Sequence, residues 1–218
     1  MRKYKLNKSE IDTVLKILKS NYPDAKSELN FNNPFELLIA TIMAAQSTDR
    51  QVNIVTKKLF DLYPGPEDII KLTEEELGEI IKSSGFYRNK SKNILKTCEM
   101  LLNEYDGKVP ENREDLVKLP GVGRKTANVV ISNVFGQEAI AVDTHVFRVT
   151  NRIGIVKAKT VEDTEKELMK KIPKHLWSKS HHWFILHGRR VCKARKPLCE
   201  ICEIRQYCIY NRKLRSES

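Results

Sequence analysis

Four of the five cysteines lie close together in the pattern C-x6-C-x2-C-x5-C. They are Cys192, Cys199, Cys202 and Cys208. Four thiolates in one loop can enclose a metal centre, either zinc or an iron–sulfur cluster. Structural zinc sites commonly use two close C-x2-C pairs, whereas this segment has one close pair between wider gaps. The spacing favours a 4Fe–4S cluster, which spreads its ligands over a larger object, held by a loop over residues 192–208.

A lysine follows a glycine turn in the segment LPGVGRKTA. Pro120 ends a short helix, because the residue before a proline is pushed out of the α region. Gly121 and Gly123 permit positive φ and a close approach of the backbone. The turn leaves successive N–H groups free at the start of the next helix, where they form a phosphate site without a side chain. This favours contact with a DNA backbone, although a plain helix–helix turn with Lys125 on the surface fits the same residues.

The same turn excludes a nucleotide-binding P-loop. That motif requires a glycine directly before its lysine and a strand before the loop. Here Arg124 precedes Lys125, and no strand pattern leads into the turn.

The segments that position these residues are predicted to be helices. Segments 7–10 and 73–76 are typical capping boxes, and Pro34 stands where a helix begins. Apolar side chains recur at helical spacing over 94–102, where Cys98 is expected in the core. Later helices are expected over 146–153, 161–172 and 177–186. Because alternating strand patterns are scarce, an all-α protein is predicted.

The charge of the chain is distributed unevenly. The formal net charge is +11. Residues 1–26 and 139–218 together carry 25 basic and 11 acidic side chains, or +14, whereas residues 27–138 carry 14 and 17, or −3. Such asymmetry indicates a polyanion docking on the terminal parts. Charge alone leaves a lysine-rich solvated surface as an equal alternative.

Length and composition indicate a globular protein. The 218 residues allow one large domain or two small ones, and 40% apolar with 31% charged residues excludes a disordered chain. No apolar run approaches the ~20 residues of a membrane span, and no signal-peptide core follows the N-terminus. We expect a cytoplasmic, nucleoid-associated protein without membrane contact that acts as a monomer, since nothing in the sequence argues for a symmetric interface.

Three motifs together resemble one family. They are LPGVGRKTAN over 119–128, AVDTHVFR over 141–148 and the four-cysteine spacing. The sequence resembles the endonuclease III family of DNA glycosylases, in the helix-hairpin-helix superfamily. The resemblance implies a two-domain, all-α fold, with a six-helix barrel over 27–138. Residues 1–26 and 139–218 then form a composite domain that holds the 4Fe–4S cluster.

The resemblance implies two catalytic residues, Lys125 as nucleophile and Asp143 as carboxylate. Breaking a glycosidic bond passes through an oxocarbenium-like transition state that a carboxylate stabilises. An amine that attacks C1′ forms an iminium, and β-elimination then cuts the strand. From the residues alone, Asp143 reads only as a helix N-cap.

Residues for DNA binding follow from the same resemblance. Gln46 matches a residue that enters the gap left by an extruded nucleotide, and Phe86 matches an apolar wedge. A polar helix end and a buried loop anchor are the plainer interpretations of these two residues. The full expected set is Gln46, Phe86, Gly121, Gly123, Arg124, His145, Arg148, Arg190 and Lys193.

These observations predict a bifunctional DNA glycosylase and AP lyase of base excision repair. Its partner is double-stranded DNA that contains damaged bases or abasic sites. It is expected to excise oxidised pyrimidines through a lysine Schiff base and to cleave 3′ to the abasic site by β-elimination. A glycosylase for another lesion or mismatch, and a non-catalytic DNA-binding iron–sulfur sensor, stay open as alternatives.

Overall fold

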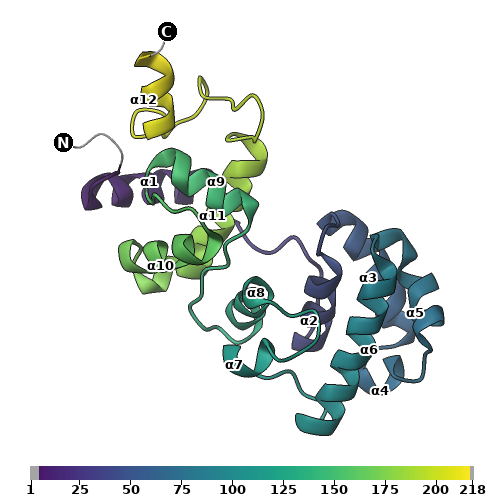
Figure 1. Cartoon of the computed structure of the whole chain (residues 1–218). Coiled ribbons are helices and arrows are strands. Elements are labelled where there is room, and N and C mark those ends of the chain that lie inside the picture. The colour runs from purple at the N-terminus through teal and green to yellow at the C-terminus, as the bar shows by residue number, and fades with distance from the viewer. Residues whose placement is uncertain (1–4, 217–218) are drawn as a thin grey trace. The chain divides into compact units, whose positions relative to one another are not determined.

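The computed structural model describes residues 5–216, and every regular element among them is a helix, which confirms the predicted all-α class (Figure 1). The chain forms two compact units. Residues 27–137 form one unit, and the other combines residues up to Lys26 with those from Glu138 onward. The division falls after Gln137, one residue before the boundary expected from the sequence. None of the described helices is long and apolar enough to cross a membrane.

The contiguous unit is built around a helix that is buried along its length. Its elements are α2 (Pro34–Met43), α3 (Asp49–Leu62), α4 (Pro66–Ile69), α5 (Glu74–Ile81), η1 (Lys82–Ser84), α6 (Tyr87–Glu104), α7 (Arg113–Leu116) and α8 (Arg124–Val134). Every residue of α2 from Phe35 to Met43 is buried, and α2 contacts α3, α6 and α8. A helix that is apolar on nearly all sides is stable only inside a core, so α2 provides the fixed support for α8.

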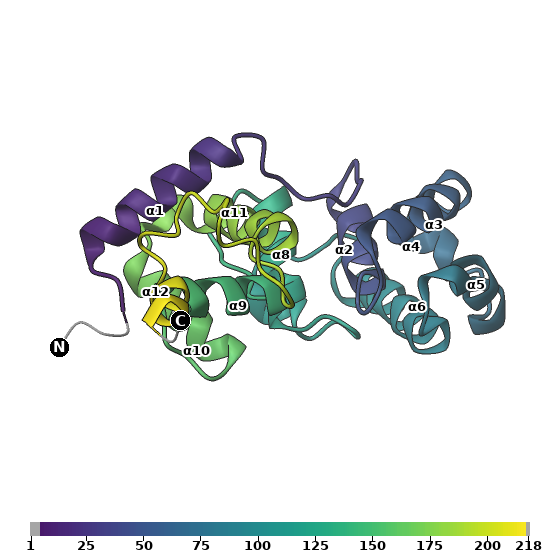
Figure 2. The same ribbon diagram turned by 90° about the horizontal axis from the view of Figure 1, so that it is seen from above.

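Both ends of the chain build the second unit. Its elements are α1 (Lys8–Asn21), α9 (Thr144–Ile153), α10 (Val161–Lys171), η2 (Lys174–Leu176), α11 (Trp177–Arg190) and α12 (Ile209–Ser216). Helix α11 contacts both α1 and α9 (Figure 2). One core joins Val14 and Leu18 to Val146 and Phe184, all without solvent exposure. Because each such side chain contributes about 1.5–3 kcal/mol on burial, α1 is an integral part of this unit.

Local sequence signals account for where the helices begin. The Asn7 side chain accepts a hydrogen bond from the Glu10 N–H, and the Glu10 carboxylate accepts one from the Asn7 N–H, each at 2.9 Å. Thr73 and Glu76 form the same reciprocal pair at α5. Pro34 occupies the first turn of α2. Both predicted capping boxes are confirmed, because their partners lie within three residues of each other.

Stability will depend on pH through His182 of α11. Burial lowers the pKa of this imidazole from 6.5 to about 4. Between these two pKa values the unfolded chain binds more protons than the folded chain, so the free energy of unfolding rises as the pH goes from 4 to 6.5. The stabilisation gained over this range is about 3 kcal/mol, and it is lost again as the pH falls. Urea unfolding of the wild type and His182→Gln across this window measures it. The exposed His175→Gln serves as control, and an equal slope in all three proteins would contradict the assignment.

Candidate DNA interface and metal centre

The glycine turn joins α7 to α8 and leaves the start of α8 without a side-chain cap. Gly123 is the N-cap residue of α8, and it provides no side-chain cap hydrogen bond to the first turn. Uncapped N–H groups at a helix start bind phosphate oxygens well. A Cβ added at Gly123 would meet no atom within 4 Å. The bare position therefore leaves space next to these amides for a ligand.

The two glycines of the turn differ in their backbone conformation and in the space around them. Gly121 uses the positive φ that glycine permits, with φ +77, and a Cβ there would lie 3.1 Å from the Asn93 amide nitrogen and 3.3 Å from Ile42. Gly123 has φ −89, which any residue adopts. Gly123 therefore does not use this freedom, because the chain is already extended where it enters α8. The turn is also held by Thr97, whose hydroxyl donates to the Pro120 carbonyl at 2.9 Å.

Lys125 extends from the first turn of α8 and is exposed. Its neighbour Arg124 is exposed too. The opposite face of the helix is fixed, because Ala127 and Val130 have no solvent exposure and α8 contacts α2. The amine is thus carried on a rigid element, directly after the uncapped amides. It belongs to the 27–137 unit.

Asp143 caps α9 in the other unit. Its Oδ1 accepts a hydrogen bond from the Val146 N–H at 2.8 Å, as the N-cap interpretation predicted. The preceding segment, residues 139–142, is buried, and the His181 ring nitrogen Nδ1 lies 2.5 Å from the Ala141 carbonyl. This contact anchors the segment that leads to the carboxylate. Among the histidines of α11, His181 therefore has a structural role.

His145 and Arg148 bring α9 against the end of α11. The Arg148 guanidinium lies 3.1 Å from His145 Nδ1 and donates to the Gly188 carbonyl at 3.0 Å and the Cys192 carbonyl at 3.1 Å. Burial lowers the pKa of His145, which Asp143 raises and Arg148 and a further arginine lower. Arg148 thus positions the start of the cysteine segment through internal contacts. The remaining basic candidates, Arg190 and Lys193, are exposed.

Gln46 and Phe86 share an unusual backbone conformation. Their φ values are +55 and +51, in the left-handed region that non-glycine residues rarely occupy. Both side chains are exposed, and Phe86 is 61% exposed. The interpretation of Phe86 as a buried loop anchor is therefore wrong. Strained residues with exposed side chains at loop tips are typical of ligand contacts.

A buried lysine that the sequence reasoning missed supports the Phe86 loop. Lys90 is 4% exposed, and its ammonium donates to the Ser84 carbonyl at 2.8 Å. Burial lowers the pKa of Lys90. The signal was present in the sequence, because Lys90 stands four residues before Ile94 and eight before Cys98, on the apolar stripe of α6. It holds the backbone directly before the two residues with positive φ, Gly85 and Phe86.

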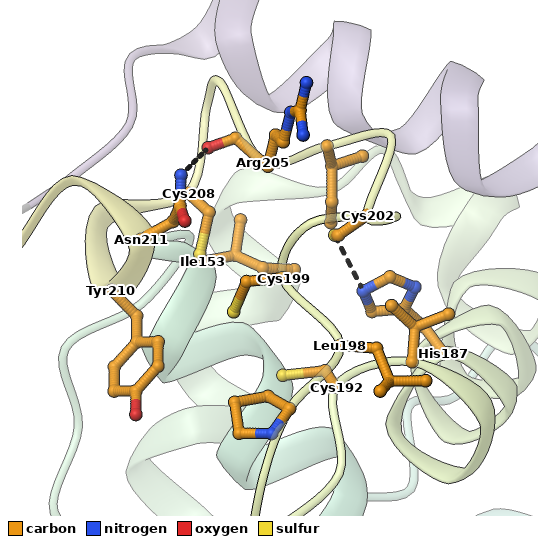
Figure 3. Close-up of a pocket in the computed structure, with 13 residues that line it drawn as sticks. Ile153, His187, Cys192, Leu198, Cys199, Cys202, Arg205, Cys208, Tyr210 and Asn211 are labelled. Carbon is orange, nitrogen blue, oxygen red and sulfur yellow. Dashed lines mark hydrogen bonds between the residues drawn. The ribbon is translucent and has the colours of Figure 1, made fainter. Parts of the chain in front are cut away.

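The four clustered cysteines line one cavity (Figure 3). The cavity encloses about 340 Å³, part of it open to solvent. Cys208 is buried and the other three are half-buried. No group of three His, Cys, Asp or Glu side chains within residues 5–216 is arranged to hold one metal ion. Four thiols around one space can serve as the ligands of a 4Fe–4S cluster.

The surroundings of the sulfurs also fit a cluster. Burial raises the pKa of Cys202 to about 11, so the thiolate form needs nearby positive charge or N–H donors. The Arg152 guanidinium lies 3.7 Å from the Cys192 sulfur. Burial also raises the pKa of Cys208. The amides oppose these rises, that of Ile204 at Cys202 and those of Asn211 and Tyr210 at Cys208. Such donors are the usual environment of ligating sulfurs.

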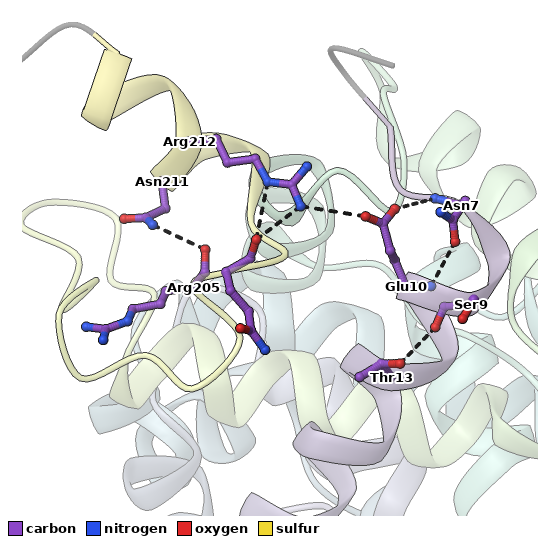
Figure 4. Close-up of polar contacts among 8 residues, drawn as sticks. Asn7, Ser9, Glu10, Thr13, Arg205, Asn211 and Arg212 are labelled. Atoms are coloured by element: carbon purple, nitrogen blue, oxygen red, sulfur yellow. Dashed lines mark hydrogen bonds and ion pairs between the residues drawn. The ribbon is translucent and has the colours of Figure 1, made fainter. Parts of the chain in front are cut away.

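An ion pair joins α12, the helix that follows the cysteine segment, to α1 (Figure 4). Arg212 of α12 lies 3.6 Å from the Glu10 carboxylate, the same group that caps α1. Its guanidinium also donates to the Gln206 carbonyl at 3.0 Å. An exposed ion pair of this kind contributes about 0–1 kcal/mol, so it orients α12 more than it stabilises it.

Replacing one of these cysteines will remove the cluster. We expect Cys208→Ala to lower the affinity for iron by more than about 100-fold, which exceeds the usual effect of losing an outer contact. Iron and sulfide per chain, with the visible absorbance of the cluster, measure the change. Cys98→Ala is the matched control, since Cys98 is buried in the core of the other unit. Full iron content in Cys208→Ala would show that Cys208 is not a ligand.

Comparison with known proteins agrees with both the predicted DNA-repair fold and the predicted iron–sulfur segment. The family profile described as "HhH-GPD superfamily base excision DNA repair protein" matches residues 39–174. The profile described as "Iron-sulfur binding domain of endonuclease III" matches residues 192–208, the segment of the four cysteines. A 4Fe–4S cluster is thus the cofactor of the chain.

Individual relatives extend the match to nearly the whole chain. Endonuclease III of Rickettsia conorii is 50% identical over 200 residues, which cover 92% of this chain and 95% of the relative. A non-covalent endonuclease III–DNA complex matches with a TM-score of 0.93 and 50% identity, covering 98% of this chain and 100% of that one. A trapped endonuclease III–DNA covalent intermediate matches with a TM-score of 0.93 and 50% identity, covering 96% and 99%. The chain therefore belongs to the endonuclease III family, within the HhH-GPD superfamily of base excision DNA repair proteins.

Proposed function

We propose that this chain excises oxidised pyrimidines from duplex DNA and then cuts the strand, with Lys125 as nucleophile and Asp143 as the stabilising carboxylate. As a member of the endonuclease III family, it is a DNA glycosylase and AP lyase of base excision repair that binds DNA. One observation carries the residue assignment. Lys125 stands in the first turn of α8, directly after amides without a side-chain cap, so that a phosphate-binding turn and an amine are adjacent.

The first step brings the damaged nucleotide out of the helix. A base inside a duplex cannot be reached, so it must be extruded. Gln46 and Phe86 are exposed on loops with left-handed backbone, which suits insertion into the vacated stack. The Lys90 contact with the Ser84 carbonyl keeps the Phe86 loop in place during this step. The amides at Gly123 hold a phosphate of the same strand.

The second step replaces the bond to the base by a bond to Lys125. The neutral Nζ attacks C1′ while the bond from C1′ to the base nitrogen breaks, and the base leaves with that electron pair and takes a proton. Positive charge that develops on the sugar is stabilised by the Asp143 carboxylate. The ammonium formed on Nζ then loses one proton, and the nitrogen lone pair opens the sugar ring by breaking the C1′–O4′ bond, so that O4′ takes up a proton and an iminium with one N–H joins Nζ to C1′.

The third step cuts the strand. The iminium makes the proton on C2′ acidic. When this proton is removed, its electron pair forms a C2′–C3′ double bond and the C3′–O bond breaks, so that the strand on the 3′ side leaves with the phosphate and the electron pair of that bond. The trapped covalent DNA intermediate of a relative supports this route. The four cysteines would hold the 4Fe–4S cluster, which when bound would give structural support to the loop that carries the basic side chains. Arg190 and Lys193, both exposed, then meet the DNA backbone.

The proposal includes the working form and place of the enzyme. A flipped nucleotide needs one set of the residues named above, so a monomer suffices. A chromosomal DNA substrate implies that the chain works in the cytoplasm, associated with the nucleoid. Sedimentation of the protein with and without a duplex tests the first point.

A duplex with one thymine glycol tests the function directly. We expect base release, cleavage 3′ to the abasic site, and a protein–DNA adduct when borohydride is present. The identical duplex with thymine is the control. Base release without an adduct would make the enzyme a simple glycosylase. Binding without either product on thymine glycol, on other damaged bases and on abasic DNA would indicate a sensor and overturn the proposal.

A further inference from the structure

A buried tyrosine and histidine connect the end of α1 to one of the clustered cysteines. The Tyr22 hydroxyl lies 3.2 Å from His187 Nδ1. His187 Nε2 lies 3.7 Å from the Cys202 sulfur (Figure 3). Tyr22 is 7% and His187 3% exposed. The three side chains come from the C-cap of α1, from α11 and from the cysteine segment.

The direction of these two hydrogen bonds follows from counting donors. A neutral imidazole carries one N–H and one bare nitrogen, and a phenol has a single proton to donate. A cysteine that ligates iron is a thiolate, which only accepts. His187 must therefore donate from Nε2 to Cys202, and its Nδ1 must accept from the Tyr22 hydroxyl.

We propose that Tyr22 is a positioning residue that locks His187 in the Nε2–H tautomer, so that His187 donates a hydrogen bond to the cluster ligand Cys202. The inference rests on the proposed role of Cys202 as a ligand. Without the Tyr22 hydroxyl, Cys202 alone would favour the proton on Nε2, and the buried Nδ1 would be an acceptor without its donor. Outer partners of metal-binding groups commonly fix a tautomer in this way.

Three further contacts hold Tyr22 where this role requires it. Its ring meets the His187 ring edge-on, with centroids 6.2 Å apart and planes at 69°. The Arg190 guanidinium lies 5.7 Å from the centre of the Tyr22 ring, within the range of a cation–π contact. The Tyr22 N–H donates to the Leu18 carbonyl at 3.0 Å and so fixes the backbone. The phenol is thus placed by α1 itself.

The lock has a measurable consequence for the cluster. An N–H donor at a ligating sulfur withdraws electron density and favours the more reduced state, because hydrogen bonds to the sulfurs set cluster potentials. Loss of the donor lowers the reduction potential. We expect Tyr22→Phe to reduce the ratio of reduced to oxidised cluster at a fixed potential by up to about tenfold, equivalent to about 59 mV for a one-electron couple.

The test compares Tyr22, which contacts His187, with a tyrosine that lines the cavity, both in the holoprotein. Tyr210 lines the cavity with its ring, and the structure gives its hydroxyl no hydrogen bond among the described residues. Tyr22→Phe should lower the potential in film voltammetry, and Tyr210→Phe should leave it unchanged. Equal potentials for Tyr22→Phe and the wild type, or equal shifts in both variants, would overturn the proposal.

A second measurement does not depend on the stability of a variant. Nitrogen-15 spectra of labelled histidine in the wild-type holoprotein should show His187 protonated at Nε2, and a proton on Nδ1 alone would refute the lock. Among variants, His187→Gln retains an amide donor near the position of Nε2 and should recover most of the potential that His187→Leu loses.

Failure of the underlying assignment would look different. If Cys202 is not a ligand, Cys202→Ala will keep its iron. If Cys202 is a ligand but the lock is absent, Cys202→Ala will lose iron while Tyr22→Phe keeps the wild-type potential. Strand cleavage of the thymine glycol duplex reports on the catalytic residues separately.

Discussion

Lys125→Gln will abolish the borohydride-trapped adduct and all β-elimination on a thymine glycol duplex. The substitution removes the only atom that bonds to C1′ in the proposed mechanism, while glutamine keeps a similar length. Loss of a nucleophile costs enzymes more than about 10³-fold in rate. Because Lys125 is exposed in the first turn of α8, the variant should fold normally. Single-turnover cleavage, followed on a gel with and without borohydride, measures the effect.

The matched control is Lys8→Gln, which makes the same change of charge at an exposed lysine in the first turn of another helix. It should retain full cleavage. Duplex binding by Lys125→Gln should weaken only slightly, since one cation is lost among many. Undiminished cleavage by Lys125→Gln would assign the Schiff base to another amine.

Asp143→Asn will separate the catalytic use of this residue from its structural use. Asparagine caps a helix as well as aspartate does, so the hydrogen bond that Val146 donates to residue 143 should persist. The charge that stabilises the oxocarbenium ion is lost, however. Loss of one preorganised electrostatic contact lowers rates by about 10²–10³-fold. We expect that loss in base release, with an unchanged melting temperature.

Thr160→Ala controls for the loss of a cap without the loss of a carboxylate. Thr160 caps α10 in the same unit through the Asp163 N–H at 3.1 Å, and its removal should cost about 1 kcal/mol of stability without slowing base release. Asp143→Ala should show both defects. If Asp143→Asn released the base at the wild-type rate, the carboxylate would have only its capping role.

Signals that are complete within a few residues were predictable from the sequence. The capping boxes at α1 and α5, the proline at α2 and the aspartate cap at α9 all formed as expected, because each partner lies within three residues. The apolar stripe of α6 correctly placed Cys98 in the core. Even here the sequence pattern hid Lys90, since a cation on an apolar stripe is normally expected to reach solvent.

Features that depend on distant parts of the chain were not predictable. The exposure of Phe86 depends on how α5, η1 and α6 pack. Tyr22 and His187 are separated by 165 positions, and nothing in either neighbourhood points to the other. The extended φ of Gly123 reflects how the chain enters α8 rather than the residue type. Resemblance supplied the proposed catalytic role of Asp143, because the residues alone indicate only a helix cap.

The discontinuous unit also sets an order for biosynthesis. The 27–137 unit can fold as soon as its residues leave the ribosome, since domains generally fold as units during synthesis. Helix α1 is made first, yet its apolar face must wait for α9 and α11. At 5–20 residues per second, the interval from the end of α1 to the end of α11 is roughly 10–30 s. The clustered cysteines are translated only after α11. Iron delivery is therefore a late event in maturation, and a nascent chain short of iron already carries one finished unit beside one that is incomplete.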